Sequence, residues 1–462
     1  MDISLRKNNT NWNDNINLLM LFFSSVFCAY IFPSLKKPFY FFLLILYFFS
    51  KRDYIWFVYI FILIQSPGQL FQKPYDSIIS ITSTVHVSIS YAFVLVAFYK
   101  YRIHHKLIST QSFLRISNPI MYYMIFLSLI SLFFGINAGS LIFMFYIWLA
   151  YLFFPLFKYV IYDKHTLYKI VSLLFFSVVI LFIWQLHDVI FTNKLYTYFG
   201  VETSLRGIGN TDDGFKLNRL FYAAAVNLIT LFSSLFFLLQ KNHFRFSRNY
   251  LYFIAFVSYL SMFLTATRGY IIMYTLIFII FSFYKKGGAL KFIFLSGVSI
   301  LTLIFLFPII NNQFDLALDR IGTIFNLLEG DSTASNTLIR LTDRAPRVWN
   351  KFIESPVFGF GLSSEGRAYN DDHVGNYTLL LQGGVLGFLL WIYVFLNYIY
   401  RLLSKSIYLK NKETAYFTIG YLFSLWIAHS TSSAIFSYYL SIHMVFIFAY
   451  LLNFIKIELN IK

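Results

Sequence analysis

Charged side chains and cysteines are both scarce in this sequence. Only 12% of its 462 residues are charged, against about 25% in soluble domains, whereas 58% are hydrophobic and 22% are aromatic. A chain of this composition has too much apolar surface to hide in a soluble core, which excludes an ordinary water-soluble protein. The single cysteine, Cys28, excludes both a disulfide framework and a cysteine-based metal site.

The apolar residues occur in runs of the length that a membrane-spanning helix requires, which is about 20 residues. The longest runs with almost no charge are Ile16–Leu35, Ile78–Tyr99, Leu167–Phe191, Leu217–Leu239 and Phe436–Leu452. We therefore expect an all-α protein, a polytopic transmembrane helical bundle of about 12–14 spans with one long, partly helical loop. Ile16–Leu35 is expected to be retained as the first span, because the short basic region, apolar region and small-residue cleavage site of a signal peptide do not stand out at the N-terminus.

The distribution of charge predicts the topology, because Lys and Arg mark cytoplasmic loops. The net charge is +17, and most basic residues lie in short loops rather than in one stripe, which argues against nucleic acid as a partner. The long polar segment 310–377 differs, since six basic and nine acidic residues give it a charge of −3 and leave +20 for the rest. We expect this segment on the outer side of the membrane and both termini on the cytoplasmic side.

Three regions follow from this pattern. Residues 1–309 are predicted to form transmembrane helices with an outward loop at about 192–216, residues 310–377 a long outward loop that carries the chemistry, and residues 378–462 the C-terminal transmembrane helices. Residues 250–283 lie between two basic loops and are too long for one straight span. Two helices should therefore meet near Thr265–Gly269.

Three arginines of the loop share one face of a predicted helix. Arg340, Arg344 and Arg347 recur at i, i+4 and i+7. Pro346 would end or kink this helix, so the face can consist of two short pieces. The face is either solvated or in contact with lipid phosphates, or it is an anion clamp for a phosphate-bearing substrate, because Arg binds phosphate through two hydrogen bonds.

A histidine lies at the predicted boundary between the loop and the next span. Asp371 and Asp372 precede His373 directly. A histidine beside carboxylates can act as a general base near neutral pH. The alternatives are an interfacial histidine without a role and a divalent-ion site, although three adjacent residues cannot all face one centre.

Three further arginines lie in or near outward segments. Arg268 separates two apolar runs, where an ionisable side chain is either functional or snorkels to the interface. Arg206 and Arg219 flank an aspartate pair near the loop 192–216 and are either substrate ligands or solvated charges.

Several of these segments together resemble a known family. Residues 356–361 read Pro-Val-Phe-Gly-Phe-Gly, His373 follows, and Gly384-Val-Leu-Gly387 begins eleven residues after the histidine and leads into an apolar run. This order resembles the O-antigen polymerase and O-antigen ligase superfamily of polytopic membrane glycosyltransferases. Thr265–Tyr270 and Leu205–Gly209 are similar to Arg-containing segments of that family. The family commonly has Asn directly after the histidine, whereas this chain has Val there and Asn376 three positions after His373.

The resemblance implies an inverting glycosyltransferase that needs no metal or other cofactor and acts at the periplasmic face. Its substrate would be an oligosaccharide linked to undecaprenyl pyrophosphate, and its partners would be membrane lipids and, as a candidate, a chain-length regulator protein. His373 and Arg268 would be catalytic. The substrate-binding residues would be Arg206, Arg219, Arg340, Arg344, Arg347, Asp372 and Asn376.

Three functions stay open at this point. The first is a polymerase that joins lipid-linked repeat units of an O-antigen or capsular polysaccharide. The second is a ligase that transfers the glycan to lipid A–core. The third, from another class, is a transporter or flippase of lipid-linked glycans. Transporters tend to have repeats and charged or broken spans at mid-membrane, whereas the charges of this chain gather at one interface, which favours an enzyme.

Overall fold

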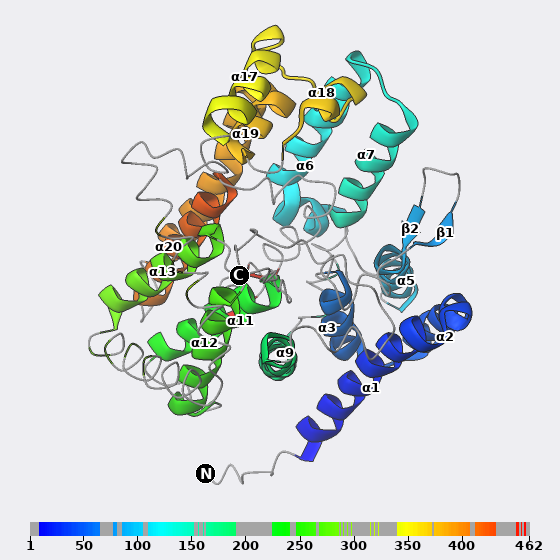
Figure 1. Ribbon diagram of the computed structural model, residues 1–462, viewed down its shortest axis with the longest axis vertical. Coiled ribbons are helices and arrows are strands. Elements are labelled where there is room, and N and C mark those ends of the chain that lie inside the picture. The colour runs from blue at the N-terminus through cyan, green and yellow to red at the C-terminus, as the bar shows by residue number, and fades with distance from the viewer. Residues whose placement is uncertain are drawn as a thin grey trace.

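The computed structural model describes residues 9–64, 77–80, 86–104, 110–151, 163–190, 224–240, 246–264, 268–285, 340–371, 374–406 and 412–430, with isolated positions outside these ranges. They form helices and one short two-stranded ribbon (Figure 1). In chain order the elements are α1 (Asn9–Ile31), η1 (Pro33–Leu35), α2 (Lys36–Phe49), α3 (Asp53–Ile64), β1 (Ser77–Ser80), β2 (His86–Ser88), α5 (Ile89–His104), α6 (Thr110–Phe133), α7 (Ala138–Tyr151), α9 (Lys164–Ile190), α11 (Ala224–Leu239), α12 (Arg248–Phe263), α13 (Arg268–Tyr284), η3 (Arg340–Arg344), α17 (Ala345–Glu354), α18 (Ser364–Tyr369), α19 (Gly375–Ser406) and α20 (Lys412–Ser430).

Two of the predicted spans have different bounds in the structure. The run Ile78–Tyr99 is not one helix, because β1 pairs antiparallel with β2 and the helix α5 begins only at Ile89. The β-branched residues of this segment favour extended backbone. The first helix ends at Ile31 rather than Leu35, because Pro33 restricts the residue before it and has no N–H for the helix.

Buried polar side chains connect the helices α9, α11 and α12. Gln185 Nε2 donates to Ser261 O at 2.9 Å, and Ser261 Oγ donates to Gln185 Oε1 at 2.6 Å. Asn227 Nδ2 donates to Ser261 Oγ at 3.0 Å. Because a polar group in apolar surroundings is stable only when it is paired, these bonds fix how the three helices align.

The segment around Arg268 contains two helices, as predicted. Helix α12 ends at Phe263 and α13 begins at Arg268. The hydroxyl oxygens of Tyr259 and Thr275 lie 3.5 Å apart, although each is several residues from the turn between the helices. The two helices therefore run antiparallel to each other.

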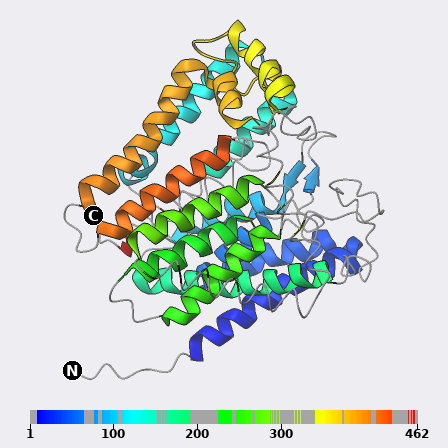
Figure 2. The same ribbon diagram turned by 60° about the vertical axis from the view of Figure 1, so that its left-hand side comes forward.

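The segments around α17 and α18 cover one end of the helices α6, α7 and α19. We call this part of the structure the loop end. Helices α6 and α7 form a hairpin in which Trp148 Nε1 donates to Ser128 Oγ at 3.1 Å. Helix α6 also packs against α19, where the ring centroids of Tyr123 on α6 and Trp391 on α19 lie 5.6 Å apart. Helices α17 and α18 sit on the end of this group, at the top of Figure 1, and Figure 2 shows the same arrangement from the side.

In the described part of the chain, two helical segments are long and apolar enough to cross a membrane, Lys164–His187 in α9 and Gly375–Asn397 in α19. Shorter apolar helices are Asp53–Ile62, Tyr91–Lys100, Pro119–Phe133, Val226–Leu239 and Ile271–Tyr284. The predicted helical class is confirmed, and the number of spans stays a prediction.

Candidate active site at the loop end

Helix α19 is interrupted at Gly384, and the glycine turn of residues 356–361 fills the interruption. Gly384 has φ 60° and ψ −167°, so the helical bonds from residues 385 and 386 back to residues 381 and 382 cannot form. The turn replaces all four partners. Phe360 N donates to Leu381 O at 2.8 Å and Gly361 N to Gln382 O at 2.7 Å, while Val385 N donates to Pro356 O at 2.8 Å and Leu386 N to Val357 O at 3.1 Å. These four backbone groups of α19 thus keep hydrogen-bond partners at the kink, which stabilises the break.

This exchange explains why glycines occur in both segments. A Cβ on Gly359 would lie 2.7 Å from Gln382 O, and a Cβ on Gly384 would overlap the carbonyl group of Val357. Gly359 and Gly361 also have positive φ, of 68° and 61°. The turn and the kink are therefore two halves of one backbone contact, and only residues without a side chain allow it.

The turn is attached to α6 and to the α6–α7 connection. Ser131 Oγ donates to Leu127 O at 2.6 Å and accepts from Leu362 N at 2.6 Å. The ring of Phe360 lies 4.7 Å from that of Phe134. These contacts hold the turn between α6 and α19.

Two arginines and one buried aspartate form the charged part of the site. Arg347 Nη2 lies 3.0 Å from one carboxylate oxygen of Asp371, and Arg344 Nη1 lies 3.5 Å from the other. The side chain of Asp371 is 8% exposed, whereas those of Arg344 and Arg347 are 36% and 49% exposed. Thr378 Oγ1 donates to the backbone oxygen of Asp371 at 2.9 Å. One carboxylate thus holds two guanidinium groups that still face solvent, which leaves N–H donors of both for an anion.

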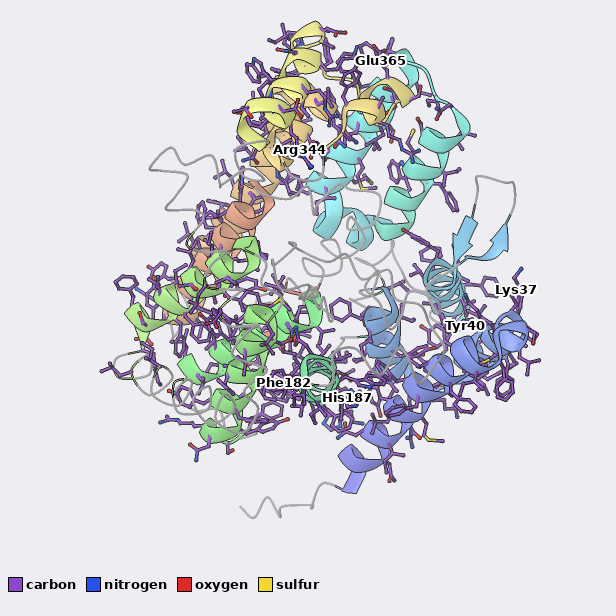
Figure 3. The ribbon with its side chains drawn as sticks, in the orientation of Figure 1. Lys37, Tyr40, Phe182, His187, Arg344 and Glu365 are labelled. Carbon is purple, nitrogen blue, oxygen red and sulfur yellow. The ribbon has the colours of Figure 1, made fainter. Side chains whose placement is uncertain are left out.

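A buried lysine of α17 forms an ion pair within its own helix and another with α18. Lys351 Nζ lies 2.5 Å from Glu354 Oε2 and 2.6 Å from Glu365 Oε1, and it also lies 4.7 Å above the ring of Phe360. The hydrogen bonds to Glu354 and Glu365 raise the pKa of Lys351 above its ordinary value. Figure 3 labels Glu365 on α18 and Arg344 beside the start of α17. Lys351 therefore acts as a fixed positive centre between the two loop helices.

The structure describes some of the predicted site residues in full and others by their backbone only, and four lie outside the described residues. Arg344 and Arg347 meet at Asp371. The π-helical η3 passes directly into α17 at Ala345, and Pro346 lies in the first turn of α17 rather than between two separate pieces. Arg340 begins η3 and Arg268 begins α13, but their side chains are outside the described part. His373, Asp372, Arg206 and Arg219 lie outside the described residues altogether.

The helix pairing locates the backbone of Arg268 relative to α19. Tyr284 stacks on Tyr416 at 6.3 Å, so α13 and α20 run antiparallel, and Phe395 of α19 lies 4.6 Å from Trp426 of α20. The start of α13 therefore points toward the end of this group at which α19 starts. The same pairing sets Arg268 near the middle of α19, about 20 Å along the helix from its start at a rise of about 1.5 Å per residue.

Three amide side chains near the kink have a buried oxygen without a hydrogen-bond partner in the described structure. They are Asn370, Asn376 and Gln382, and Gln382 is fully buried with its nitrogen unpaired as well. Asn376 was a predicted substrate ligand. Gln382 and Lys351 were missed, although a polar residue inside an apolar run was an available signal for Gln382.

Among the described residues, no three His, Cys, Asp or Glu side chains gather as metal ligands. Asp371 is engaged by its two arginines. No family model matches this chain, and no curated protein matches it.

Proposed function

We propose that the protein is a polysaccharide polymerase that joins repeat units linked to undecaprenyl pyrophosphate at the periplasmic face of a bacterial inner membrane. The observation that carries this proposal is the pair Arg344 and Arg347, held by the buried Asp371 at the start of α19. A partly exposed arginine pair suits a pyrophosphate, because each guanidinium can bind two of its oxygens. Asp371 precedes His373 by two residues, which links the anion site to a proton acceptor.

The proposed reaction is a displacement at the anomeric carbon of the donor glycan. A hydroxyl of the acceptor sugar attacks that carbon, and the His373 imidazole takes the hydroxyl proton. The bond from the anomeric carbon to the pyrophosphate oxygen breaks, and its electron pair leaves with the lipid pyrophosphate. Arg344 and Arg347 stabilise the charge that develops on the leaving oxygen. Arg206, Arg219 and Arg340 are proposed as further anion ligands, and Asn376 and Asp372 as ligands of sugar hydroxyls. Arg268, which begins α13 near the middle of α19, is proposed to contact the lipid-linked substrate away from the Arg344–Arg347 pair.

The membrane setting is supported by the surface of the described helices. Large apolar side chains are strongly exposed on separate helices, including Phe49 at 76%, Phe133 at 84% and Phe283 at 77%. Water-soluble surfaces rarely expose such side chains over wide areas. Together with the apolar segments in α9 and α19, this favours a membrane protein in contact with lipids. The distribution of basic residues leads us to propose several spans with cytoplasmic termini, and a chain-length regulator is proposed as a candidate partner.

The test is the glycan profile of a deletion strain of the native host, complemented with the wild type or with variants. Deletion is expected to leave single repeat units on lipid A–core without a ladder of longer chains. The variants His373→Ala and Arg347→Lys should both fail to restore the ladder although they are present in the membrane in normal amounts. The first lacks the base, and the second has a single ammonium group in place of a planar guanidinium that binds two oxygens. A restored ladder in the His373→Ala strain would contradict the assignment of the base.

The chain offers a matched control for the arginine variant. Arg52 also forms an ion pair with a buried aspartate, Asp14, at 3.2 Å. In the sequence it is far from the segments that form the loop end. Arg52→Lys makes the same chemical change and should restore the ladder fully. Long chains stranded on the lipid carrier with bare lipid A–core would instead indicate a ligase, and an unchanged profile would contradict a glycosyltransferase.

A further inference from the structure

Helix α17 has an apolar side that the rest of the described structure leaves uncovered. Val348 and Phe352 pack into the loop end, whereas Trp349 is 41% and Ile353 is 54% exposed. Trp349 and Ile353 are four residues apart and share one side of the helix. The next positions, Asn350 and Glu354, are polar and also exposed. An apolar and a polar side thus both face outward.

The uncovered side continues into the exposed face of α19. Val357 and Phe358 follow α17 and are about half exposed. The hydrogen bond from Leu386 N to Val357 O joins this tip to α19. From that point, exposed apolar residues follow one another along α19 at helical spacing: Val385, Leu386, Leu389, Tyr393, Leu396 and Tyr400. The surface of α17 is therefore the extension of the face of a candidate membrane span.

We infer that α17 lies along the lipid–water interface, with Trp349 and Ile353 inserted into the leaflet beside α19. The bilayer is the partner because the exposed apolar face of α19 and that of α17 form one continuous surface. The residue types on this surface agree with an interfacial position, because Trp and Tyr favour the headgroup level of membranes. The ring centroids of Trp349 and Tyr377 lie 6.1 Å apart. An interfacial helix is buried only on its apolar side, so Asn350 and Glu354 stay in water.

This placement has a consequence for the charged pair. Arg347 lies two residues before Trp349 on the same helix, so an α17 anchored in the leaflet holds the Arg344–Arg347 pair near the height of lipid phosphates. A substrate that carries its pyrophosphate on a membrane-embedded tail presents it at that height. The inference rests on the proposed membrane setting of α19 and does not depend on the proposed reaction.

The experiment measures the depth of single spin labels in the full chain, reconstituted in vesicles of phosphatidylethanolamine and phosphatidylglycerol. Labels are attached to Trp349→Cys and Ile353→Cys, with Asn350→Cys and Glu354→Cys as matched controls one position along the same helix. Leu389→Cys reports the face of α19. Cys28 is only 8% exposed, and the unsubstituted chain treated with the same reagent gives its background signal.

The expected result is a ratio of oxygen to nickel-chelate collisions that is several-fold higher at residues 349 and 353 than at 350 and 354. Equal, water-like ratios at all four positions, with lipid-like values at Leu389, would overturn the inference and leave the membrane setting of α19 intact. Labels at 349 and 353 that neither reagent reaches would also overturn it, because protein would then cover this side. Water-like values at Leu389 would overturn the membrane setting itself.

Discussion

Replacement of Gly384 by alanine tests the contact between the glycine turn and the kinked helix most directly. The backbone of Gly384, at φ 60° and ψ −167°, lies in a region that only glycine adopts without strain, and this strain amounts to about 1–3 kcal/mol for another residue. The new Cβ would also overlap the carbonyl group of Val357, which is backbone and cannot rotate away. The two effects together should weaken the contact by about 3 kcal/mol or more.

Hydrogen exchange measured by mass spectrometry reports this weakening locally. The amides of Phe360, Gly361, Val385 and Leu386 are bonded across the contact. A loss of about 3 kcal/mol should lower their protection about a hundredfold, since each 1.4 kcal/mol corresponds to about a factor of ten. Gly383→Ala is the matched control, because its φ is not positive and its nearest neighbours lie 3.6 Å from the new Cβ. Full protection in Gly384→Ala, or an equal loss in both variants, would refute the reasoning.

Three more predictions concern the charged and polar groups nearby. Asp371→Asn should raise the donor KM about fivefold in a reconstituted assay, because a half-exposed pair of this kind contributes about 1 kcal/mol to holding each arginine; an unchanged KM would show that the arginines need no carboxylate. Lys351→Met should lower the exchange protection of α17 by about 1 kcal/mol or less at neutral pH. Because the carboxylates raise the pKa of Lys351 from 10.5, this difference should persist below pH 10.5 and vanish as the pH rises through the raised value; a difference that vanishes near neutral pH would contradict the ion pairs. Gln382→Met should increase thermal stability by about 1–3 kcal/mol, because it removes two buried polar atoms without partners in the described structure, and a decrease would indicate a hidden partner.

The features that the sequence could predict depend on local chemistry. The composition predicted helices, and the positions of basic residues around 250–283 predicted the break before Arg268. Pro346 predicted an end or kink in the helix of the arginines, and the structure changes from the π-helical η3 to α17 at Ala345, one residue before Pro346. Each of these predictions follows from backbone restrictions or from residues close to one another in the chain.

The features that the sequence could not predict depend on contacts between distant segments. The glycines of the turn were recognised, but not that their partner is the interruption of α19, because the spacing of two motifs does not reveal which backbone groups they exchange. Asp371 was noted as a neighbour of His373, whereas its partners lie 24 and 27 positions earlier in the chain. Ile78–Tyr99 was predicted to be a helix from its apolar content, although β-branched residues favoured a ribbon at its start.

Two kinds of contact hold the loop end together, and they respond to different perturbations. The exchange between the turn and the kink consists of backbone hydrogen bonds among buried groups, so ionic strength and pH should hardly affect it. The Arg344–Asp371–Arg347 group is partly exposed, so salt screens it, and a phosphate ligand can bind the guanidinium donors that Asp371 leaves free. A rigid backbone frame whose held arginines keep such donors is suited to bind and release a pyrophosphate. The frame can therefore be disrupted at Gly384, and the anion site altered at Asp371, independently of each other.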